Sequence, residues 1–412
     1  MRRHDPRPRL APSPVGSGPE RGADALSHDA LAEHLSSLSL VDHHVHGAFR
    51  DDVADEVFAE TITESDRGGR SGQSAFDSPV GFAILRWCAP LLDLEPHASP
   101  SDYLARRHEL GVAGVNRRFL SAEQVSAFLV DTGFNADGLL SPEETASAGG
   151  AVAREVVRLE AVAEEVAAEG PGAAGFAERL AQRLDERLVD AVGTKSIVAY
   201  RHGFDLDPER PGPDEVTAAA GRWLGELDRT GRARLSHPTL LRHLLWSGID
   251  AGLPLQLHAG YGDTDLDLHR SNPLLLTEFL RLAEPSGTPV VLLHCYPYHR
   301  EAGYLAQMFP NVFFDVGLAV IYAGGSAATI VAEALEVAPF GKQLFSSDGW
   351  GASELHFLGA HLWRRAMARV LGHLVDHGEW SLPNARRVAS MIGEGNATSL
   401  YRLPTPAPAG HA

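Results

Sequence analysis

Short apolar runs alternate along the chain with longer segments in which apolar residues recur every three or four positions. The runs are typical of buried strands, and the longer segments are typical of amphipathic helices. Strands that alternate with helices form parallel sheets, and runs that are apolar on both faces favour a closed sheet with helices outside. The pattern therefore predicts an α/β fold, the (β/α)8 TIM barrel. The eight predicted strands are 38–44, 125–131, 156–160, 196–201, 254–258, 289–294, 312–316 and 343–348.

The connection between the first two predicted strands is far longer than the others. Residues 51–123 are too many for one strand-to-helix connection, so we expect a helical insertion that covers one end of the barrel. The barrel domain, insertion included, is predicted to span residues 28–403. The predicted helices are 78–92, 101–110, 214–227, 238–247 and 272–283.

The two ends of the chain differ in composition from this domain. Residues 1–27 are rich in Arg, Pro and Gly and lack the apolar stretch of a secretory signal, which predicts a disordered tail. Residues 404–412 are rich in Pro and Ala and are predicted to form a flexible tail.

Net charge and cysteine content narrow the choice of partners. The 36 basic and 54 acidic residues give a formal net charge of -18, which disfavours nucleic acid and anionic membranes. No apolar run approaches the roughly 18 residues of a membrane-spanning helix. Cys88 and Cys295 cannot form a disulfide framework, and their apolar neighbours predict buried thiols. We expect a cytoplasmic protein with a small-molecule substrate; a homo-oligomer is compatible with this picture.

Metal-binding residue types follow four of the predicted strands. His44 and His46 end the first strand, and their spacing of two places both side chains on one face. The carboxyl ends of barrel strands meet at one rim, so residues far apart in sequence converge there. Several buried imidazoles and a carboxylate need a compensating charge, which a divalent cation supplies. The other residues in this pattern are His258, His294 and Asp348.

At these positions the chain resembles the amidohydrolase superfamily, which has His-x-His after strand 1, His after strands 5 and 6, and Asp after strand 8. Longer segments resemble the amidohydrolase-2 branch related to the N-terminal half of FluG proteins. These segments are 256–263, 294–304, 311–317 and 346–349. The resemblance implies a metal-dependent hydrolase that uses metal-activated water.

The resemblance also implies roles for the individual residues. His44, His46, His258 and Asp348 are expected to bind the metal. Asp348 is expected to move the proton of the attacking water, and His294 to stabilise charge on the substrate.

The number of metal ions depends on a lysine in this superfamily. Members with two ions usually bridge them by a carboxylated lysine, or sometimes a glutamate, after strand 4. Lys195 and Lys342 each precede an apolar run, so we expect both at the bottom of the barrel. Glu160, at the end of the third predicted strand, is a weaker candidate because Arg158 and Glu155 are near it in sequence. We therefore expect one divalent ion, with Zn²⁺ favoured and Mn²⁺ or Fe²⁺ compatible.

Residues for substrate binding are less clearly marked. Tyr200 and Arg201 end the fourth predicted strand, where Arg201 could bind a substrate carboxylate or pair with a protein carboxylate. Glu160 and His299 are further candidates for the pocket.

Three functions are compatible with these residues. The first is hydrolysis of an amide or other C–N bond in a small carboxylate-bearing substrate, with γ-glutamyl compounds suggested by the FluG resemblance. The second is decarboxylation, because the aminocarboxymuconate-semialdehyde decarboxylase group shares the first-strand and eighth-strand ligands. The third is a non-catalytic barrel that partners a glutamine synthetase, a domain found in some FluG-like proteins.

Overall fold

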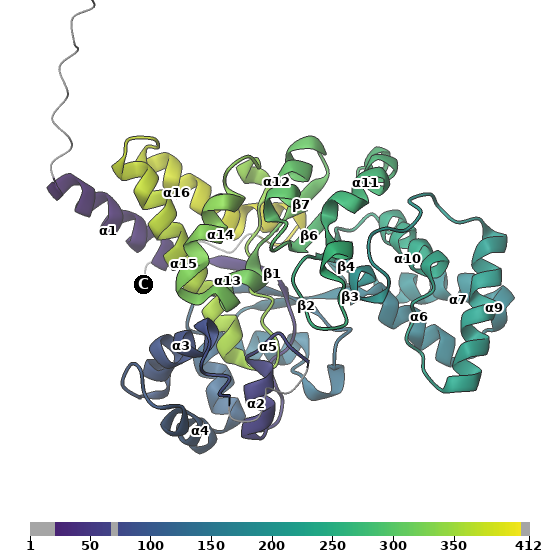
Figure 1. Ribbon diagram of the computed structural model, residues 1–412, viewed down its shortest axis with the longest axis horizontal. Coiled ribbons are helices and arrows are strands. Elements are labelled where there is room, and N and C mark those ends of the chain that lie inside the picture. Colours follow the sequence, from purple (N-terminus) through teal and green to yellow (C-terminus); the bar gives the residue numbers. More distant parts are fainter. Residues whose placement is uncertain (1–20, 67–72, 405–412) are drawn as a thin grey trace, which may run out of the picture.

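The computed structural model describes residues 21–66 and 73–404. Seven parallel strands lie in chain order at its centre, with helices between successive strands (Figure 1). This arrangement is a (β/α)8 barrel-like fold, as predicted, and it brings the carboxyl ends of all the strands to one rim. The strands are β1 (Leu40–Val45), β2 (Val125–Asp131), β3 (Val152–Arg158), β4 (Gly193–Ser196), β5 (Leu255–Ala259), β6 (Val290–His294) and β7 (Val312–Phe314).

The eighth predicted strand, 343–348, closes the ring without regular strand geometry. The Leu344 amide donates to the Phe314 carbonyl at 3.0 Å, which joins this segment to β7. On its other side, the His43 amide donates to Phe345 and the Asp348 amide donates to the His44 carbonyl, at 3.3 and 3.1 Å. The segment therefore links β7 to β1 and carries Asp348 to the rim beside His44.

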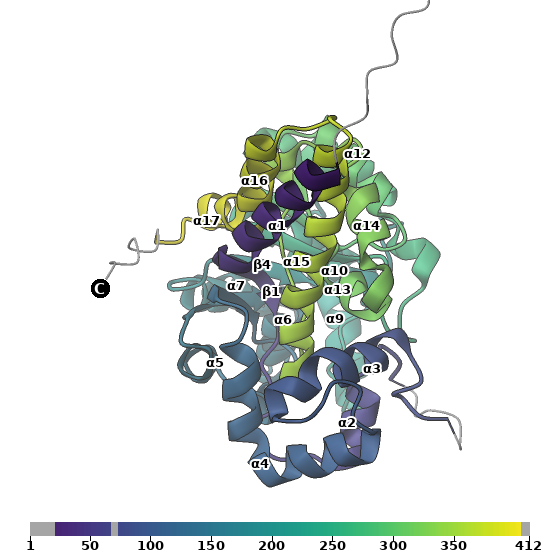
Figure 2. The ribbon, with the colours of Figure 1, turned by 90° about the vertical axis from the view of Figure 1, so that its left-hand side faces the viewer.

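Helices surround the sheet on all sides. The insertion between β1 and β2 is helical, as predicted, and its helices α2, α3 and α4 gather together below the strands in Figure 1. Figure 2 shows α15 running between α1 and this insertion. The α-helices are α1 (Arg21–Ser37), α2 (Asp55–Thr61), α3 (Pro79–Ala83), α4 (Pro100–Leu120), α5 (Pro142–Gly149), α6 (Leu159–Ala168), α7 (Gly172–Arg187), α8 (Val198–Arg201), α9 (Pro213–Thr230), α10 (Pro238–Asp250), α11 (Thr277–Ala283), α12 (His299–Met308), α13 (Gly317–Ala323), α14 (Ala327–Ala334), α15 (Ser353–Asp376), α16 (Leu382–Ser390) and α17 (Asn396–Leu400).

Two strand predictions are shifted. The third strand ends at Arg158 rather than at residue 160, and the fourth is Gly193–Ser196 rather than 196–201. The sequence of β4 is Gly-Thr-Lys-Ser, so it has no apolar run, whereas the apolar run after it forms the short helix α8. Hydrophobicity therefore marked the wrong residues, because the side chains of β4 are polar and yet buried.

The predicted tails are only partly covered by the description. Helix α1 begins at Arg21, so residues 21–27 are helical and the prediction of a disordered tail over 1–27 was wrong for them. Residues 1–20 and 405–412 lie outside the described residues. Cys88 and Cys295 are buried free thiols, as predicted.

Two apolar clusters form the core. The larger one lies between the strands and the surrounding helices. The smaller one is inside the sheet, where Ala397 of α17 and Tyr401 pack against alternate residues of the strands. The C-terminal helix thus closes the inside of the barrel beneath the rim. The smaller cluster comprises Val41, Ala127, Leu129, Val156, Val291, Leu293, Leu344, Ala397 and Tyr401.

The expectation that no apolar run approaches the length of a membrane-spanning helix was wrong for one described segment, Gly317–Ala334, which is long and apolar enough by length and composition alone to cross a membrane. It is not one continuous helix, since it is divided into α13, a short 3-10 turn and α14. More than half of it is buried, with Val320, Ile321 and Ile330 in the larger core cluster. Packing against the barrel accounts for its apolar composition.

Candidate metal centre

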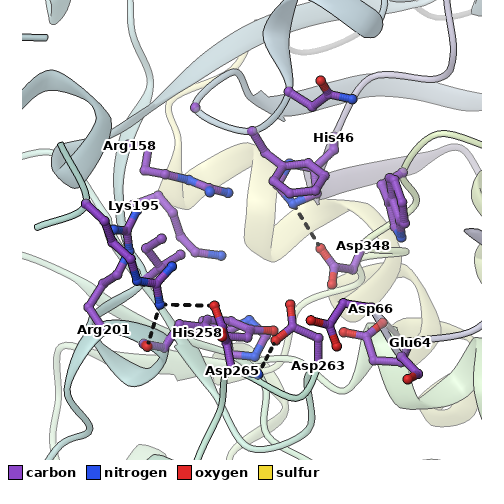
Figure 3. A pocket seen from close by; sticks show the side chains of 18 of the residues that line it. His46, Glu64, Asp66, Arg158, Lys195, Arg201, His258, Asp263, Asp265 and Asp348 are labelled. Carbon is purple, nitrogen blue, oxygen red and sulfur yellow. Dashed lines mark hydrogen bonds and ion pairs between the residues drawn. The ribbon is translucent and has the colours of Figure 1, made fainter. Parts of the chain in front are cut away.

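Three side chains converge at the carboxyl rim of the sheet. Nε2 of His44 lies 3.1 Å from Oδ1 of Asp348. Nε2 of His46 lies 3.7 Å from the same oxygen (Figure 3). The three donor atoms all lie within 4.8 Å of one another, and no other group of this kind occurs in the part of the chain that the structure describes. Two imidazole nitrogens and a carboxylate oxygen at this spacing can share one cation.

The second nitrogen of each imidazole is held by a hydrogen-bond acceptor. Nδ1 of His44 donates to Oε1 of Gln256 at 2.8 Å, and Nδ1 of His46 donates to the Asp131 carbonyl at 3.2 Å. Because both acceptors require the proton on Nδ1, the lone pair of each Nε2 is directed at the shared centre. The chain thus fixes the tautomer and the direction of both rings.

The protonation states also suit a divalent cation. Burial lowers the pKa of His44 well below its ordinary value and that of His46 to about 4, so both rings are neutral near pH 7. Oδ1 of Asp348 is buried and accepts no hydrogen bond from any described residue. An unsatisfied carboxylate oxygen between two neutral imidazoles fits the ligand preferences of Zn²⁺, and also those of Mn²⁺ and Fe²⁺.

Replacing Gln256 with Leu is expected to weaken the binding of a divalent cation about 10- to 100-fold, because His44 loses the acceptor that sets its tautomer. Competition with a chromophoric chelator measures the affinity. Tyr401→Phe is the matched control: the Tyr401 hydroxyl accepts from Nε2 of Gln256 at 2.9 Å in the same buried network but does not touch His44. Equal affinities of the two variants would count against this role of Gln256.

His294 ends β6 beside the three donors. Its Nε2 lies 3.4 Å from Oδ2 of Asp348, and neither ring nitrogen forms a hydrogen bond within the described ranges. The backbone of His294 and of Asp348 is left-handed, with φ of 68° and 53°, which costs about 1–3 kcal/mol per residue and persists mainly at functional positions. His294 is therefore placed to bond a substrate oxygen next to Asp348.

His258, the fourth predicted ligand, lies next to the cluster rather than within it. Its Nε2 faces the Tyr261 carbonyl at 3.0 Å, and its ring packs on His294 and Tyr200 with centroid distances of 4.6 and 4.5 Å. It lines the cavity above the metal centre. The structure brings His44, His46 and Asp348 together and leaves His258 as a neighbour.

The prediction that Lys195 lies at the bottom of the barrel was wrong. Lys195 is the third residue of the short strand β4, is fully buried, and places Nζ 3.2 Å from Nε2 of His44. Burial lowers its pKa to about 8. Lys342 ends a 3-10 turn and packs on Phe313, outside the lining of the cavity. We expected one ion because both lysines were predicted to lie at the bottom of the barrel. The position of Lys195 beside His44 removes that argument.

A cavity of about 500 Å³ opens above the metal centre. Its lining comes from the ends of several strands, from α8, and from the segment that follows α2 in the insertion (Figure 3). The volume is sufficient for a small-molecule substrate. The charged lining residues are Glu60, Glu64, Asp66, Arg158, Lys195, Arg201, Arg234, Asp263, Asp265 and Asp348.

The four predicted substrate residues divide into two pairs. Tyr200 and Arg201 line the cavity, and Arg201 also pairs with Glu164 at 2.8 Å. Glu160 is fully buried in α6, where it accepts hydrogen bonds from the Ser196 hydroxyl and the Ile197 amide. His299 is buried against Glu333 at 2.7 Å. Glu160 and His299 therefore support the fold in place of the substrate contacts that their sequence positions suggested.

Two further features of the site were missed or only partly recognised from the sequence. Asp131 of β2, predicted to be a supporting or turn residue, forms a buried ion pair with Arg158 of β3 at 2.7 Å. Glu64 reaches the cavity from the insertion. The sequence could have marked Asp131 as a site residue because it ends an apolar run. Glu64 lies within a long connection, where no sequence pattern marks it.

The chain is similar to a described family and to a curated protein. The family model described as Amidohydrolase matches residues 94–403. Protein fluG of Emericella nidulans is 31% identical over 241 residues, which are 55% of this chain and 28% of that protein. The chain therefore matches under a third of the length of this relative.

Solved structures with the same fold include proteins of more than one described activity. A candidate metal-dependent hydrolase from Lactobacillus casei ATCC 334 superposes with a TM-score of 0.80 at 30% identity, over 90% of this chain and 97% of that one. Glucuronate isomerase from Caulobacter crescentus superposes with a TM-score of 0.60 at 14% identity, over 97% and 98% of the two chains, which shows a common fold alone.

Proposed function

Because the chain belongs to the amidohydrolase family, we propose that it is a metal-dependent hydrolase of an amide or other C–N bond in a small carboxylate-bearing substrate. The observation that carries the proposal is the convergence of His44, His46 and Asp348 below a cavity of substrate size. A divalent cation, with Zn²⁺ favoured, would be held by these three residues and would supply electrophilic activation of the substrate and of water.

Asp348 is the proton carrier in this proposal. Burial raises the pKa of its carboxyl to about 6, which lies close to neutral pH. A group with such a pKa can accept the proton of the attacking water and then donate it to the leaving nitrogen. Oδ2 of Asp348 faces His294 at 3.4 Å, and Oδ1 faces the imidazoles of His44 and His46, so the carboxylate lies between these imidazoles and His294.

His294 and the basic side of the cavity orient the substrate. Burial keeps His294 neutral by lowering its pKa, so one ring nitrogen can donate to the oxygen on which negative charge develops. Arg201 and Lys195 lie on the side of the cavity that would receive a substrate carboxylate. The resemblance of part of the chain to FluG makes γ-glutamyl amides the first compounds to assay.

Removal of the metal is expected to abolish turnover. The protein is purified with its native metal, which is identified by elemental analysis, and is then stripped with a chelator. Metal-loaded and stripped protein are assayed for amine release from a panel of γ-glutamyl amides and N-acyl amino acids. Amine release that disappears on stripping and returns with Zn²⁺, Mn²⁺ or Fe²⁺ supports the proposal. Metal-dependent release of CO₂ without amine would replace it by a decarboxylase, and loaded protein that releases neither would contradict it.

A further inference from the structure

A second cavity, of about 420 Å³, lies between α1 and α15, two helices that pack side by side (Figure 2). Its lining includes Ser36, which stands just before β1, and Ala122, which stands just before β2. The cavity therefore lies near the amino ends of these strands, whereas the metal centre lies at the carboxyl rim of the sheet. No described residue lines both cavities, so this one is a separate feature of the molecule.

The charged lining of the second cavity is mainly basic. Three arginines of α15 and a single carboxylate line it: Arg364, Arg365, Arg369 and Glu123. The carboxylate is already engaged, because Oε2 of Glu123 lies 2.9 Å from Nε of Arg364 and Oε1 lies 2.9 Å from Nδ1 of His361. Arg365 and Arg369 are left without a counter-charge in the described lining, although the formal net charge of the whole chain is -18.

Arg365 presents unused hydrogen-bond donors to this cavity. Its guanidinium stacks on the Trp87 ring, 4.2 Å from the centroid. Stacking fixes the plane of a guanidinium and leaves its N–H groups free to donate within that plane. Arg365 forms no hydrogen bond and no ion pair with residues of 21–66 or 73–404, and its nitrogens are open to solvent rather than enclosed. A ligand in the cavity can therefore reach these donors.

Arg369 and Arg86 add positive charge around Arg365. Arg369 is exposed, lies one helical turn further along α15, and has no carboxylate partner in the described ranges. Arg86 stacks on the same Trp87 ring at 4.1 Å, from a π-helical turn, Ile84–Cys88, a rare geometry that is frequent at functional sites. Burial, followed by the charges of Arg369 and Arg86, lowers the pKa of Arg365. These like charges repel one another, and a bound anion would offset the repulsion.

The arrangement favours a phosphate group over a single carboxylate. Arg365 and Arg369 lie one turn apart on the same face of α15, so they offer two planar sets of donors. A phosphate group carries close to two negative charges and several accepting oxygens, which suffice for both guanidiniums. A carboxylate carries one charge and fills one such set. The cavity volume of about 420 Å³ is within the usual range for small-molecule ligands.

We propose that this cavity binds a phosphate group, free or carried by a small molecule, through the guanidiniums of Arg365 and Arg369. Arg364 and Glu123 fix the wall of the cavity, since Arg364 pairs with Glu123 and also donates to the Leu38 carbonyl at 2.8 Å. The site does not depend on the proposed hydrolase function, because no residue of the metal centre takes part in it. It adds a ligand site near the amino ends of the strands to the candidate active site at their carboxyl ends.

Calorimetric titration of the full-length protein, with its native metal and at low ionic strength, measures the binding of inorganic phosphate. Arg365→Gln and Arg369→Gln are each expected to weaken this binding about 10- to 100-fold, the range for loss of one charged hydrogen bond. The control is Arg229→Gln, which removes the same charge from an exposed position of α9 outside both cavities and is expected to leave the affinity unchanged. A titration with glycerol 3-phosphate distinguishes the two sources of the group: tighter binding than inorganic phosphate assigns the site to phosphate monoesters, and weaker binding assigns it to free phosphate.

Thermal melting without phosphate verifies that each variant is folded, and the exposed position of Arg369 makes its replacement the safer of the two for the fold. Three results would overturn the proposal: no binding of phosphate at millimolar concentration, an affinity that both substitutions leave unchanged, or an equal loss in Arg229→Gln. Phosphate held only at the metal centre would give the second of these results. Succinate that binds as tightly as phosphate would show a site for dicarboxylates in its place.

Discussion

Replacement of Asp348 with Asn is expected to lower turnover by about 10²- to 10⁴-fold in a protein that remains folded. The amide of Asn is close to the carboxylate in size, so the packing beside His44 and His294 is kept. It cannot accept a proton from water or return one to the leaving group. The measurement is kcat on whichever amide the metal-dependent assay identifies, together with circular dichroism and metal content.

Metal content separates the two roles of Asp348. If the variant keeps its metal and loses turnover, the carboxylate moves protons; if it loses both, ligation is its main contribution. Asp250→Asn serves as the control, since Asp250 pairs with Arg210 in an exposed position of α10 and lies outside the cavity lining. Unchanged turnover with unchanged metal content in Asp348→Asn would refute the assigned role.

Replacement of Arg158 with Met is expected to lower the free energy of unfolding by about 3–5 kcal/mol, because it leaves the Asp131 carboxylate buried without a counter-charge. The pair is almost completely buried, with side-chain exposures of 9% for Arg158 and 0% for Asp131. Urea unfolding of the stripped protein measures the loss. The double variant Asp131→Ala with Arg158→Met is expected to recover much of it, because neither charge then remains in the interior.

The effect of Arg158→Met depends on pH with a definite sign. Burial alone would raise the pKa of Asp131, but the Arg158 guanidinium outweighs it and holds that pKa below the ordinary carboxyl range. A lowered folded-state pKa adds stability that is complete above the unfolded-state pKa of about 4 and disappears as the pH falls further. The difference between wild type and variant should therefore be largest near pH 7 and shrink in acid. A difference that grows in acid would show that the pair does not act through its charge.

The positions of the candidate ligands at the ends of apolar strands could be predicted because local sequence specifies both the strand and its last residue. His44, His46 and Asp348 each stand where an apolar run stops, and a parallel barrel brings such positions to one rim. The position of Lys195 could not be predicted in this way. Strand β4 has a polar sequence, so the hydrophobic pattern did not mark it as a strand. Glu160 was placed at a strand end because β3 stops two residues earlier than its pattern suggested.

Side-chain partners depend on contacts between segments that are distant in sequence. Arg201 could have faced a substrate or a protein carboxylate, and only the tertiary structure places Glu164 of α6 beside Arg201 of α8. His258 lies near the end of β5, as predicted, yet the loop after β5 brings the Tyr261 carbonyl within 3.0 Å of its Nε2.

The sequence by itself determined the strand and helix alternation, the helical insertion and the rim at which the candidate metal-binding residues lie. These follow from the period of apolar side chains and from which residue ends each run. The tertiary structure alone decided that Lys195 sits at the metal centre, that Asp131 and Arg158 neutralise each other, and that Glu64 faces the cavity. These are pairings of polar groups across tens to hundreds of residues. The sequence identifies the polar residues that need a partner when they are buried. Only the closed barrel determines which residue that partner is.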